Sequence, residues 1–411
     1  MNADMPMHRP SNTMSDQGPI LVLNCGSSSI KFALFDTGST PLPRAALYSG
    51  KVQGIGQAQP TLDESGRAPL PLVLDAEHPT TAALQIILAR VNAQLQGAPL
   101  KAVAHRVVHG GQHYFAPTRI TQAVIDELRA LIPLAPLHQP FPLKAMSLIL
   151  QQHPATAQVA CFDTAFHRTV PQVEQMFALP WSAWESGIRR YGFHGLSYDF
   201  MSRALPERHG DLACGRTIVA HLGSGASLCA MQNLQSRATT MGFSALDGLM
   251  MGTRCGLLDP GAVIYLMQEQ KLSTDAVAAM LYHDSGLLGV SGVSPDPREL
   301  LPLEAGNERV RAALALYVQR IVREIGALTA VLGGLDMLVF TAGIGEHNDL
   351  LRARICERLG WLGVQIDAQA NARHAVTISA AGSRVSVGVE KTNEEWVAAQ
   401  QTLELLAAQT A

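Results

Sequence analysis

The chain has little of what marks membrane, secreted or nucleic-acid-binding proteins. No apolar run approaches the roughly 18 residues of a membrane-spanning helix. The six cysteines show no paired metal-site spacing, so a reducing cytoplasm is the simplest expectation. A formal net charge of −3 provides no basic surface for nucleic acid. The composition, 47% apolar and 16% charged, is that of an ordinary globular protein.

The chain is long enough for two domains, since 411 residues exceed one comfortable core. Residues 1–19 contain Asp4 and Asp16 and lack an apolar core, so they predict an N-terminal extension and not a secretory leader.

Two segments share one pattern of apolar strand, glycine-serine turn and second apolar strand. The first is NCGSSSIKF, residues 24–32, which follows the apolar residues 20–23. The second is TIVAHLGSGASLCAM, residues 217–231. The pattern predicts one hairpin used once in each of two similar lobes, and chance similarity between two glycine turns is the alternative.

A third glycine turn lies in residues 337–360, MLVFTAGIGEHNDLLRARICERLG, and leads into a helix. Asn348 is the expected N-cap and Gly360 the expected residue after the helix. Strands that alternate with helical segments predict the α/β class.

Glycine-serine turns are suited to phosphate, because backbone N–H groups approach an anion closely where there is no Cβ. Lys31 supplies a counter-charge beside the first turn. Tight hairpins also need glycine, but three such turns favour nucleotide binding. Neither a P-loop nor a dinucleotide-binding glycine motif follows any of the strands.

Cationic side chains stand beside glycine-rich turns. In KAVAHRVVHGG, residues 101–111, Arg106 and Val108 are expected on one face of a strand, which suits a small carboxylate with an apolar tail. A structural ion pair is the alternative for Arg106. His194 stands between two glycines in RRYGFHGLSYDF, where Ser197 is expected to cap the next helix. A purely structural histidine is the more common case. Arg254 lies in another glycine loop.

Three acidic positions and one helix start complete this pattern. Asp163 follows an apolar run, where active sites of sheet proteins tend to lie. Asp259 and Pro260 predict a helix start. In KTNEEWVAAQQ, Thr392 and Glu395 fit a capping box, which leaves Glu394 free to face a metal-bound water.

These groups favour phosphoryl transfer to a carboxylate. A hydroxyl acceptor needs a base, whereas a small carboxylic acid, with a pKa of about 4 to 5, is already ionised at neutral pH. Its repulsion from ATP has to be neutralised, and planar guanidinium groups suit that purpose.

Ten segments in this order resemble the acetate kinase family, within the superfamily of acetate and sugar kinases, Hsp70 and actin. They are NCGSSSIKF, HRVVHGG, LAPLHQP, FDTAFH, RRYGFHG, HLGSGAS, MGFSALDGLMMGTR, SGVSPDPREL, FTAGIGE and TNEE. The resemblance, from about residue 20 to 400, implies reversible transfer of the ATP γ-phosphoryl group to acetate, giving acetyl phosphate and ADP. It also implies Mg²⁺ (or Mn²⁺), two duplicated actin-like, ribonuclease H-like lobes around a cleft, and a homodimer.

The resemblance further implies a role for each matching position. Catalysis would fall to Asp163, His194 and Arg254, with Asp163 orienting an arginine or water. Substrate contacts would come from Arg106, Val108, Leu137, Phe193 and Ala245. Asn24 and Glu394 would lie by the metal. ATP would contact Lys31, His221, Leu222, Gly223, Ser224, Gly225, Asp296, Pro297, Arg298, Gly343, Ile344, Gly345, Glu346 and His347.

Some positions depart from the family pattern. Ser224, Gln139 and His347 each stand where asparagine is usual, and Leu257 replaces a polar residue. Ala245 replaces a proline, which leaves room for a longer acid.

The predicted division of the chain is 20–164 plus 394–411 for one lobe and 165–393 for the other, with hinges near 164 and 393. Two alternatives remain open at this point. One is a propionate or butyrate kinase, and the other is an ATP-gated interaction module like the actin or Hsp70 core, which would not need the two arginines and the histidine.

Overall fold

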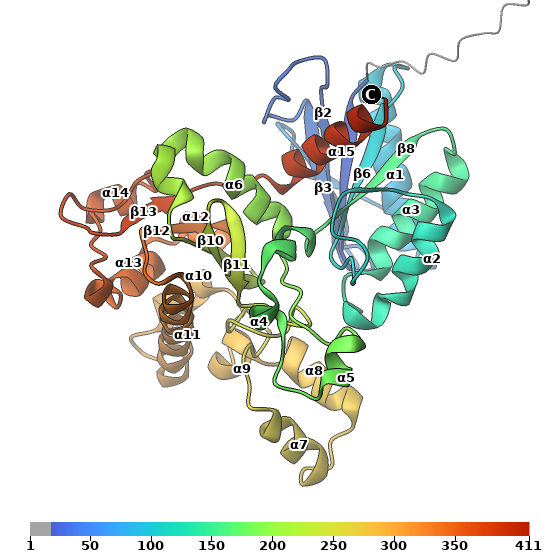
Figure 1. Ribbon diagram of the computed structural model, residues 1–411. Coiled ribbons are helices and arrows are strands. Elements are labelled where there is room, and N and C mark those ends of the chain that lie inside the picture. The colour runs from blue at the N-terminus through green and yellow to red at the C-terminus, as the bar shows by residue number, and fades with distance from the viewer. Residues whose placement is uncertain (1–17, 411) are drawn as a thin grey trace, which may run out of the picture.

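The computed structural model describes residues 18–410, so the expected extension at residues 1–19 lies almost wholly outside the described residues. Two β-sheets form the core, one in each half of the molecule (Figure 1). The first has the strand order β5-β4-β3-β2-β1-β6-β8-β7 and the second has the order β11-β10-β9-β12-β13.

The first sheet consists of β1 Ile20–Cys25, β2 Ser29–Phe35, β3 Tyr48–Gln53, β4 Thr61–Glu64, β5 Leu70–Pro71, β6 Ala102–Val107, β7 Thr118–Arg119 and β8 Ala157–Phe162. The second consists of β9 Thr217–Leu222, β10 Ala226–Gln232, β11 Gln235–Thr239, β12 Met337–Thr341 and β13 Ser386–Val389.

The two sheets repeat one topology. In each, three strands pair antiparallel and two more follow in parallel, as β3-β2-β1-β6-β8 and as β11-β10-β9-β12-β13. The hairpins β1–β2 and β9–β10 stand at the same place in each. The predicted α/β class and the duplicated hairpin are therefore confirmed.

The helices are α1 Pro79–Leu95, α2 Gln122–Ala130, α3 Pro140–Gln152, α4 Gln172–Gln175, α5 Trp181–Glu185, α6 Gly195–His209, α7 Pro260–Gln268, α8 Thr274–His283, α9 Gly286–Ser291, α10 Pro297–Leu300, α11 Glu308–Leu332, α12 Ala342–His347, α13 Asp349–Glu357, α14 Ala368–Ala372 and α15 Glu394–Thr410. Within residues 18–410, none of them is long and apolar enough to cross a lipid bilayer.

Side chains on successive strand residues enter different cores. Leu21 and Leu23 of β1 pack with α1 and α3, whereas Ile20 and Val22 pack with α15. In the second sheet, Ile218 packs with α11. Because side chains alternate along a strand, helices cover both faces of the sheets. Each fully buried leucine or isoleucine contributes about 1.5–3 kcal/mol to folding.

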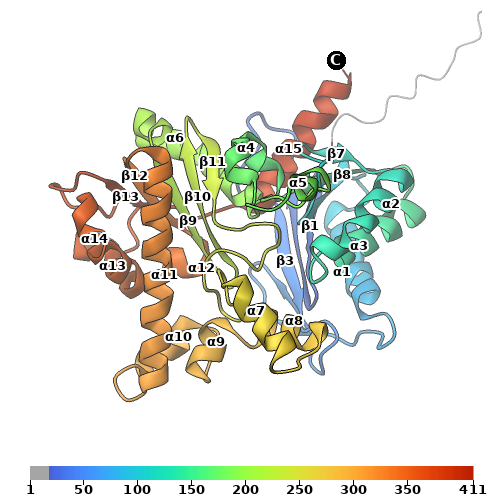
Figure 2. The same cartoon turned by 60° about the horizontal axis from the view of Figure 1, so that its bottom comes forward.

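Helices α6 and α15 share one hydrophobic core with strands of both sheets and so join them. Figure 1 shows α15 on the first sheet and α6 beside the second, and Figure 2 shows the same molecule turned by 60°. Arg203 of α6 forms an ion pair with Glu404 of α15 at 2.9 Å. Gln401 of α15 donates a hydrogen bond to Asp199 of α6 at 2.7 Å. Although α15 ends the described chain, it packs on the first sheet. The lobe boundaries near residues 164 and 393 stay a prediction.

Two expected helix starts are confirmed. Asp259 accepts a hydrogen bond from the Gly261 N–H at 2.7 Å, with Pro260 as the first helical residue. Asn348 accepts from the Leu351 N–H at 3.0 Å.

Three local expectations are wrong. The side chain of Asn393, not that of Thr392, accepts from the first turn of α15, at 3.0 Å from the Trp396 nitrogen. Asparagine is as good an N-cap as any residue, so the cap lies one residue later than predicted. Helix α6 already begins at Gly195, so Ser197 lies inside it. Helix α13 ends at Glu357, so Gly360 does not terminate it.

Candidate active site

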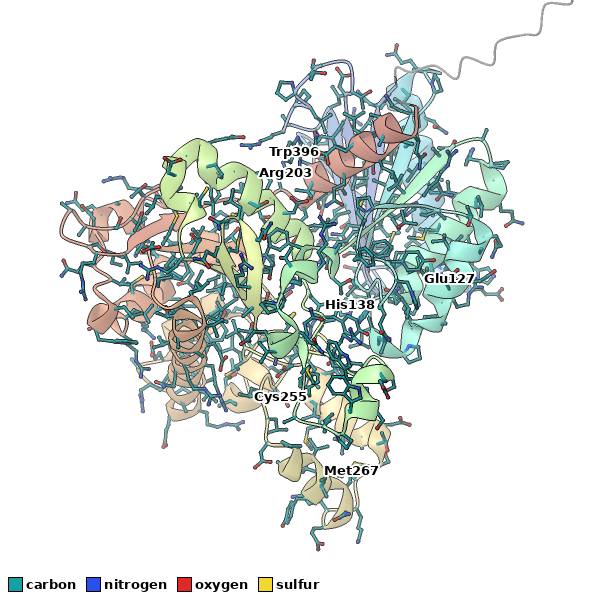
Figure 3. All side chains as sticks on the ribbon, viewed as in Figure 1. Glu127, His138, Arg203, Cys255, Met267 and Trp396 are labelled. Carbon is teal, nitrogen blue, oxygen red and sulfur yellow. The ribbon has the colours of Figure 1, made fainter. Side chains whose placement is uncertain are left out.

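A cavity of about 590 Å³ lies where the two hairpin turns face each other. Figure 3 labels one of its lining residues, His138, between the two halves of the molecule. Fourteen of the predicted site residues line it: Asn24, Lys31, Arg106, Val108, Leu137, His194, His221, Gly223, Ser224, Gly225, Arg254, Gly343, Glu346 and Glu394. Residues up to 370 positions apart in the sequence thus meet in one place.

The two glycine turns form opposite walls of this cavity. In the first, the Gly26 N–H donates to the Ser29 carbonyl at 2.8 Å, and in the second the Gly223 N–H donates to the Gly225 carbonyl at 3.1 Å. A Cβ atom placed on Gly225 would lie 3.5 Å from His194 Nε2 and 3.6 Å from Arg254 Nη1. The turn, the imidazole and the guanidinium therefore converge on one point.

Arg106 is held by two carboxylates. Its Nε and Nη2 donate to Asp163, the shortest contact being 2.7 Å, and Nη1 lies 3.2 Å from Glu394. Burial lowers the pKa of Arg106, but the two carboxylates more than compensate and raise it. Burial raises the pKa of Asp163, and Arg106 opposes that rise. Asp163 is buried behind Arg106 and does not line the cavity, so it orients the guanidinium.

Arg254 differs from Arg106, because among the described residues no carboxylate pairs with it. Its Nη1 donates to the Ala245 carbonyl at 2.9 Å. Burial lowers the pKa of Arg254. A partly buried cation without an ionic partner is a favourable place for an incoming anion.

His194 and His221 are stacked with ring centroids 4.1 Å apart. Burial, the neighbouring His221 and the two arginines lower the pKa of His194 well below its usual value. Burial also lowers the pKa of His221, to about 4. These surroundings oppose a positive charge on His194, and the expectation that it belongs to a set of positive groups stays a prediction.

Asn24 and Glu394, the expected metal ligands, both line the cavity. Burial raises the pKa of Glu394, but Arg106, His221 and Lys31 lower it further, so the carboxylate is ionised at neutral pH. Among residues 18–410 no group of three His, Cys, Asp or Glu side chains has metal-ligand geometry. Mg²⁺ is usually held by one or two carboxylates together with water and substrate phosphates, so this donor set fits it.

The other predicted residues do not line the cavity: Asp163, Leu222, Phe193, Ala245, Asp296, Pro297, Arg298, Ile344, Gly345 and His347. Phe193 is buried against the His109 ring. Ala245 packs on the core of the second lobe. Asp296 and Arg298 pair with each other at 2.5 Å, and His347 is 67% exposed.

The cavity is also lined by residues that the sequence analysis does not assign to the site. These are Cys25, Gly26, Ser27, Ser28, Ser29, His138, Ala342, Thr392 and Glu395. The three serines stand in the first glycine turn, and His138 follows Leu137, so both lay beside recognised signals. Glu395 lines the cavity and is not part of a capping box, because the cap of α15 is Asn393.

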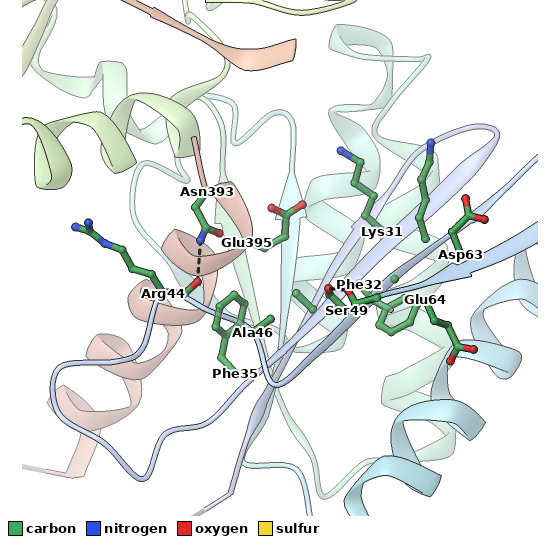
Figure 4. Close-up of a pocket in the computed structure, with 14 residues that line it drawn as sticks. Lys31, Phe32, Phe35, Arg44, Ala46, Ser49, Asp63, Glu64, Asn393 and Glu395 are labelled. Atoms are coloured by element: carbon green, nitrogen blue, oxygen red, sulfur yellow. Dashed lines mark hydrogen bonds between the residues drawn. The ribbon is translucent and has the colours of Figure 1, made fainter. Parts of the chain in front are cut away.

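A second cavity, of about 480 Å³, lies along β2 (Figure 4). Lys31 and Glu395 line both cavities. The Asn393 side chain donates to the Arg44 carbonyl at 2.9 Å, which ties the start of α15 to the first lobe.

The family model described as the Acetokinase family matches residues 19–400. The chain belongs to this family. The acetate kinase of Rhodopseudomonas palustris (strain TIE-1) is 46% identical over 391 residues, which are 94% of this chain and 98% of that protein. The chain is a member of a family of kinases and thus a phosphotransferase enzyme.

Solved structures of two kinases have the same fold as this chain. The Porphyromonas gingivalis acetate kinase has a TM-score of 0.84 and 37% identity, covering 95% of this chain and 100% of that one. A Francisella tularensis propionate kinase has a TM-score of 0.85 and 34% identity, covering 93% and 98%. The duplicated actin-like architecture is thus shown.

Proposed function

We propose that this acetokinase family member transfers the γ-phosphoryl group of ATP to acetate, reversibly giving acetyl phosphate and ADP. The observation that carries the proposal is the convergence of His194 Nε2 and Arg254 Nη1 on the Gly225 turn, in the cavity that Arg106 also lines. Arg106 is available to the acetate carboxylate and Arg254 to the γ-phosphoryl group. Transfer between two anions requires positive charge beside each of them.

Each side chain has a defined part in the transfer. Arg106, oriented by Asp163, binds the acetate carboxylate, and an acetate oxygen attacks the γ-phosphorus directly. The new O–P bond forms as the bond to the bridging β–γ oxygen breaks, and ADP leaves. Acetate arrives ionised, so no base is needed. Arg254 and His194 donate hydrogen bonds to the equatorial oxygens.

Mg²⁺, near Asn24 and Glu394, supplies charge neutralisation on the phosphates when it is bound. ATP phosphates contact the two glycine turns and Lys31. The nucleoside end contacts Asp296 to Arg298 and Gly343 to His347, with Gly343 and Glu346 already lining the cavity.

The methyl group of acetate packs against Val108 and Leu137, which line the cavity. Phe193 and Ala245 complete this pocket when the lobes close around the substrates. One extra methylene in an apolar pocket changes discrimination by only about 1–3 kcal/mol. Propionate is therefore a second candidate substrate, and one related structure is titled a propionate kinase.

The test mixes the enzyme with ATP, Mg²⁺ and acetate, propionate or butyrate, and traps the acyl phosphate with hydroxylamine. Hydroxamate should form with acetate, and the three rates measured side by side rank the acids. Folded protein that forms no hydroxamate with any of the three acids would end the proposal. Slow ATP hydrolysis that no carboxylate changes would indicate the interaction-module alternative.

We also propose a homodimer in the cytoplasm. Helix α7 is mostly apolar, yet none of its residues, all of them described, is buried. Ile264 and Tyr265 are 54% and 57% exposed, and such a surface favours a second copy of the chain as its cover. The cytoplasmic location is supported by the six cysteines, all described and all free thiols.

Replacing Ile264 with aspartate should convert the dimer to a monomer in analytical ultracentrifugation. Leu47 is 57% exposed in the first lobe, so Leu47→Asp is the matched control and should leave the mass unchanged. A wild-type monomer at micromolar concentration contradicts the proposal.

A further inference from the structure

The two ring nitrogens of His194 face different surroundings. Its backbone has a φ of 58°, which turns the ring into the cavity at the start of α6. On one side, Nδ1 lies 2.8 Å from the hydroxyl of Ser227 on β10. On the other side, Nε2 faces the turn at Gly225. Which nitrogen carries the proton decides whether this histidine can donate a hydrogen bond into the cavity.

The Ser227 hydroxyl has a second partner, the hydroxyl of Tyr198, at 2.6 Å. Both residues are 0% exposed. Within residues 18–410, Ser227 is the only hydrogen-bond partner of the Tyr198 hydroxyl. A buried donor left without an acceptor is strongly unfavourable, so the Tyr198 proton has to be donated to Ser227.

The direction of the remaining hydrogen bond follows. Because Ser227 accepts from Tyr198, its own proton is free to point at His194 Nδ1, which then accepts. The reverse arrangement, with a proton on Nδ1 donated to Ser227, would leave one buried hydroxyl proton, that of Ser227 or that of Tyr198, without an acceptor among the described residues.

We propose that Tyr198 and Ser227 are positioning residues that hold His194 as a neutral imidazole with its proton on Nε2, directed at the Gly223–Gly225 turn. The chain of hydrogen bonds also resists formation of an imidazolium ion, since a second ring proton, on Nδ1, would leave a buried hydroxyl proton without an acceptor. The catalytic role of this tautomer, in which Nε2–H donates to the transferring phosphoryl group, rests on the proposed function. The assignment of the proton to Nε2 does not depend on that function.

The groups around His194 also disfavour a second proton on its ring. His221 stacks on it, and Arg106, Arg254 and His167 place further positive or protonatable groups nearby. His221 has a similar arrangement, in which Nδ1 lies 2.9 Å from Ser197 and Ser197 lies 2.9 Å from Thr392.

The two chains of hydrogen bonds differ at their far ends. Thr392 is only half-buried and its hydroxyl can donate to water, so burial does not fix the direction there. A hydrogen-bond direction fixed by burial is therefore specific to Tyr198 and Ser227.

The experiment compares the wild type with Tyr198→Phe, which removes the terminal donor, and with Tyr317→Phe as the matched control. Tyr317 is also buried, in α11, and its hydroxyl has no hydrogen-bond partner among the described residues. Long-range ¹H–¹⁵N spectra of ¹⁵N-histidine-labelled protein at pH 7 show which ring nitrogen is protonated. The His194 signals are assigned by their loss in His194→Gln.

We expect an unprotonated Nδ1 and a protonated Nε2 in the wild type and in Tyr317→Phe. In Tyr198→Phe a mixture of tautomers should appear, and kcat should fall about five- to thirtyfold, the scale of one or two kcal/mol, with little change in either KM. In Ser227→Ala, adding Tyr198→Phe should cause no further loss of kcat, since the chain is already broken.

A wild-type His194 with its proton on Nδ1, or an imidazolium ion at pH 7, would overturn the proposal even if Tyr198→Phe failed to fold. An unchanged tautomer and kcat in folded Tyr198→Phe would do so as well. If the enzyme proved inactive with every acid, the spectrum would still decide the tautomer.

Discussion

At the scale of single residues, the two arginines of the site have opposite electrostatic surroundings. Arg106 is fixed by Asp163 and Glu394, whereas Arg254 has no carboxylate partner among residues 18–410. The first is oriented by the protein itself, and in the proposed function the second keeps its charge for the phosphoryl group. Precise orientation of a guanidinium suits a planar carboxylate, and an unpaired cation suits charge that develops during transfer.

Replacing Asp163 with asparagine tests this orientation. The shape is kept but the charge that holds Arg106 is lost, so kcat/KM for acetate should fall about a hundredfold, equivalent to roughly 2.7 kcal/mol, while KM for ATP changes little. Asp247→Asn is the control, since the Arg190–Asp247 ion pair at 3.1 Å lies outside the cavity. If Asp163→Asn instead abolished the fall in rate that the wild type shows at low pH, Asp163 would act as a general base.

At the scale of elements, the start of α15 joins the helix to the cavity. Asn393 accepts from the Trp396 N–H and donates to the Arg44 carbonyl, and the next two residues, Glu394 and Glu395, line the cavity. A change in the cap therefore alters the position of the carboxylate that contacts Arg106.

Asn393→Ala should lower the free energy of unfolding by about 1 kcal/mol and also lower kcat/KM for acetate. Asn307→Ala removes the cap of α11, which accepts from the Arg309 and Val310 N–H groups away from the cavity. It should cause a similar loss of stability in urea titrations with no change in kcat/KM. Equal losses of kcat/KM in both variants would contradict the link between cap and site.

The elements also show what sequence patterns can predict. The hairpin turns and the positions of Arg106 and Arg254 follow from local patterns of apolar runs and glycine. Thr392 and Asn393 are both good capping residues, so the sequence alone does not decide between them. In the structure Asn393 caps α15, and the Thr392 hydroxyl lies 2.9 Å from that of Ser197 instead. The contact between Arg106 and Asp163, 57 positions apart, and that between Tyr198 and Ser227, 29 apart, depend on how distant strands and helices pack.

At the scale of the whole molecule, buried histidines couple folding to pH. His105, His167 and His221 are 0%, 3% and 7% exposed, and burial is the main cause that lowers the pKa of each to about 4. In an unfolded chain they titrate near 6.5. Between these values the unfolded chain binds more protons, so acid favours unfolding.

The free energy of unfolding should therefore fall as the pH is lowered from about 6.5 towards 4, by up to about 1.4 kcal/mol per pH unit for each histidine. Urea titrations at pH 7.5, 6.5 and 5.5 measure this. In His105→Gln, which removes one of the three groups, the dependence should be shallower. A stability that stays constant down to pH 5.5 would contradict the expectation.

The packing of α15 on the first sheet has a consequence for biosynthesis. Ile20 and Val22 belong to β1, but the helix that covers their face, α15, begins only at Glu394. Chains emerge from the ribosome N-terminus first, so this face of the first sheet stays uncovered until α15 has emerged. A nascent polypeptide stalled before codon 394 should therefore be a client for chaperones that bind exposed apolar strands.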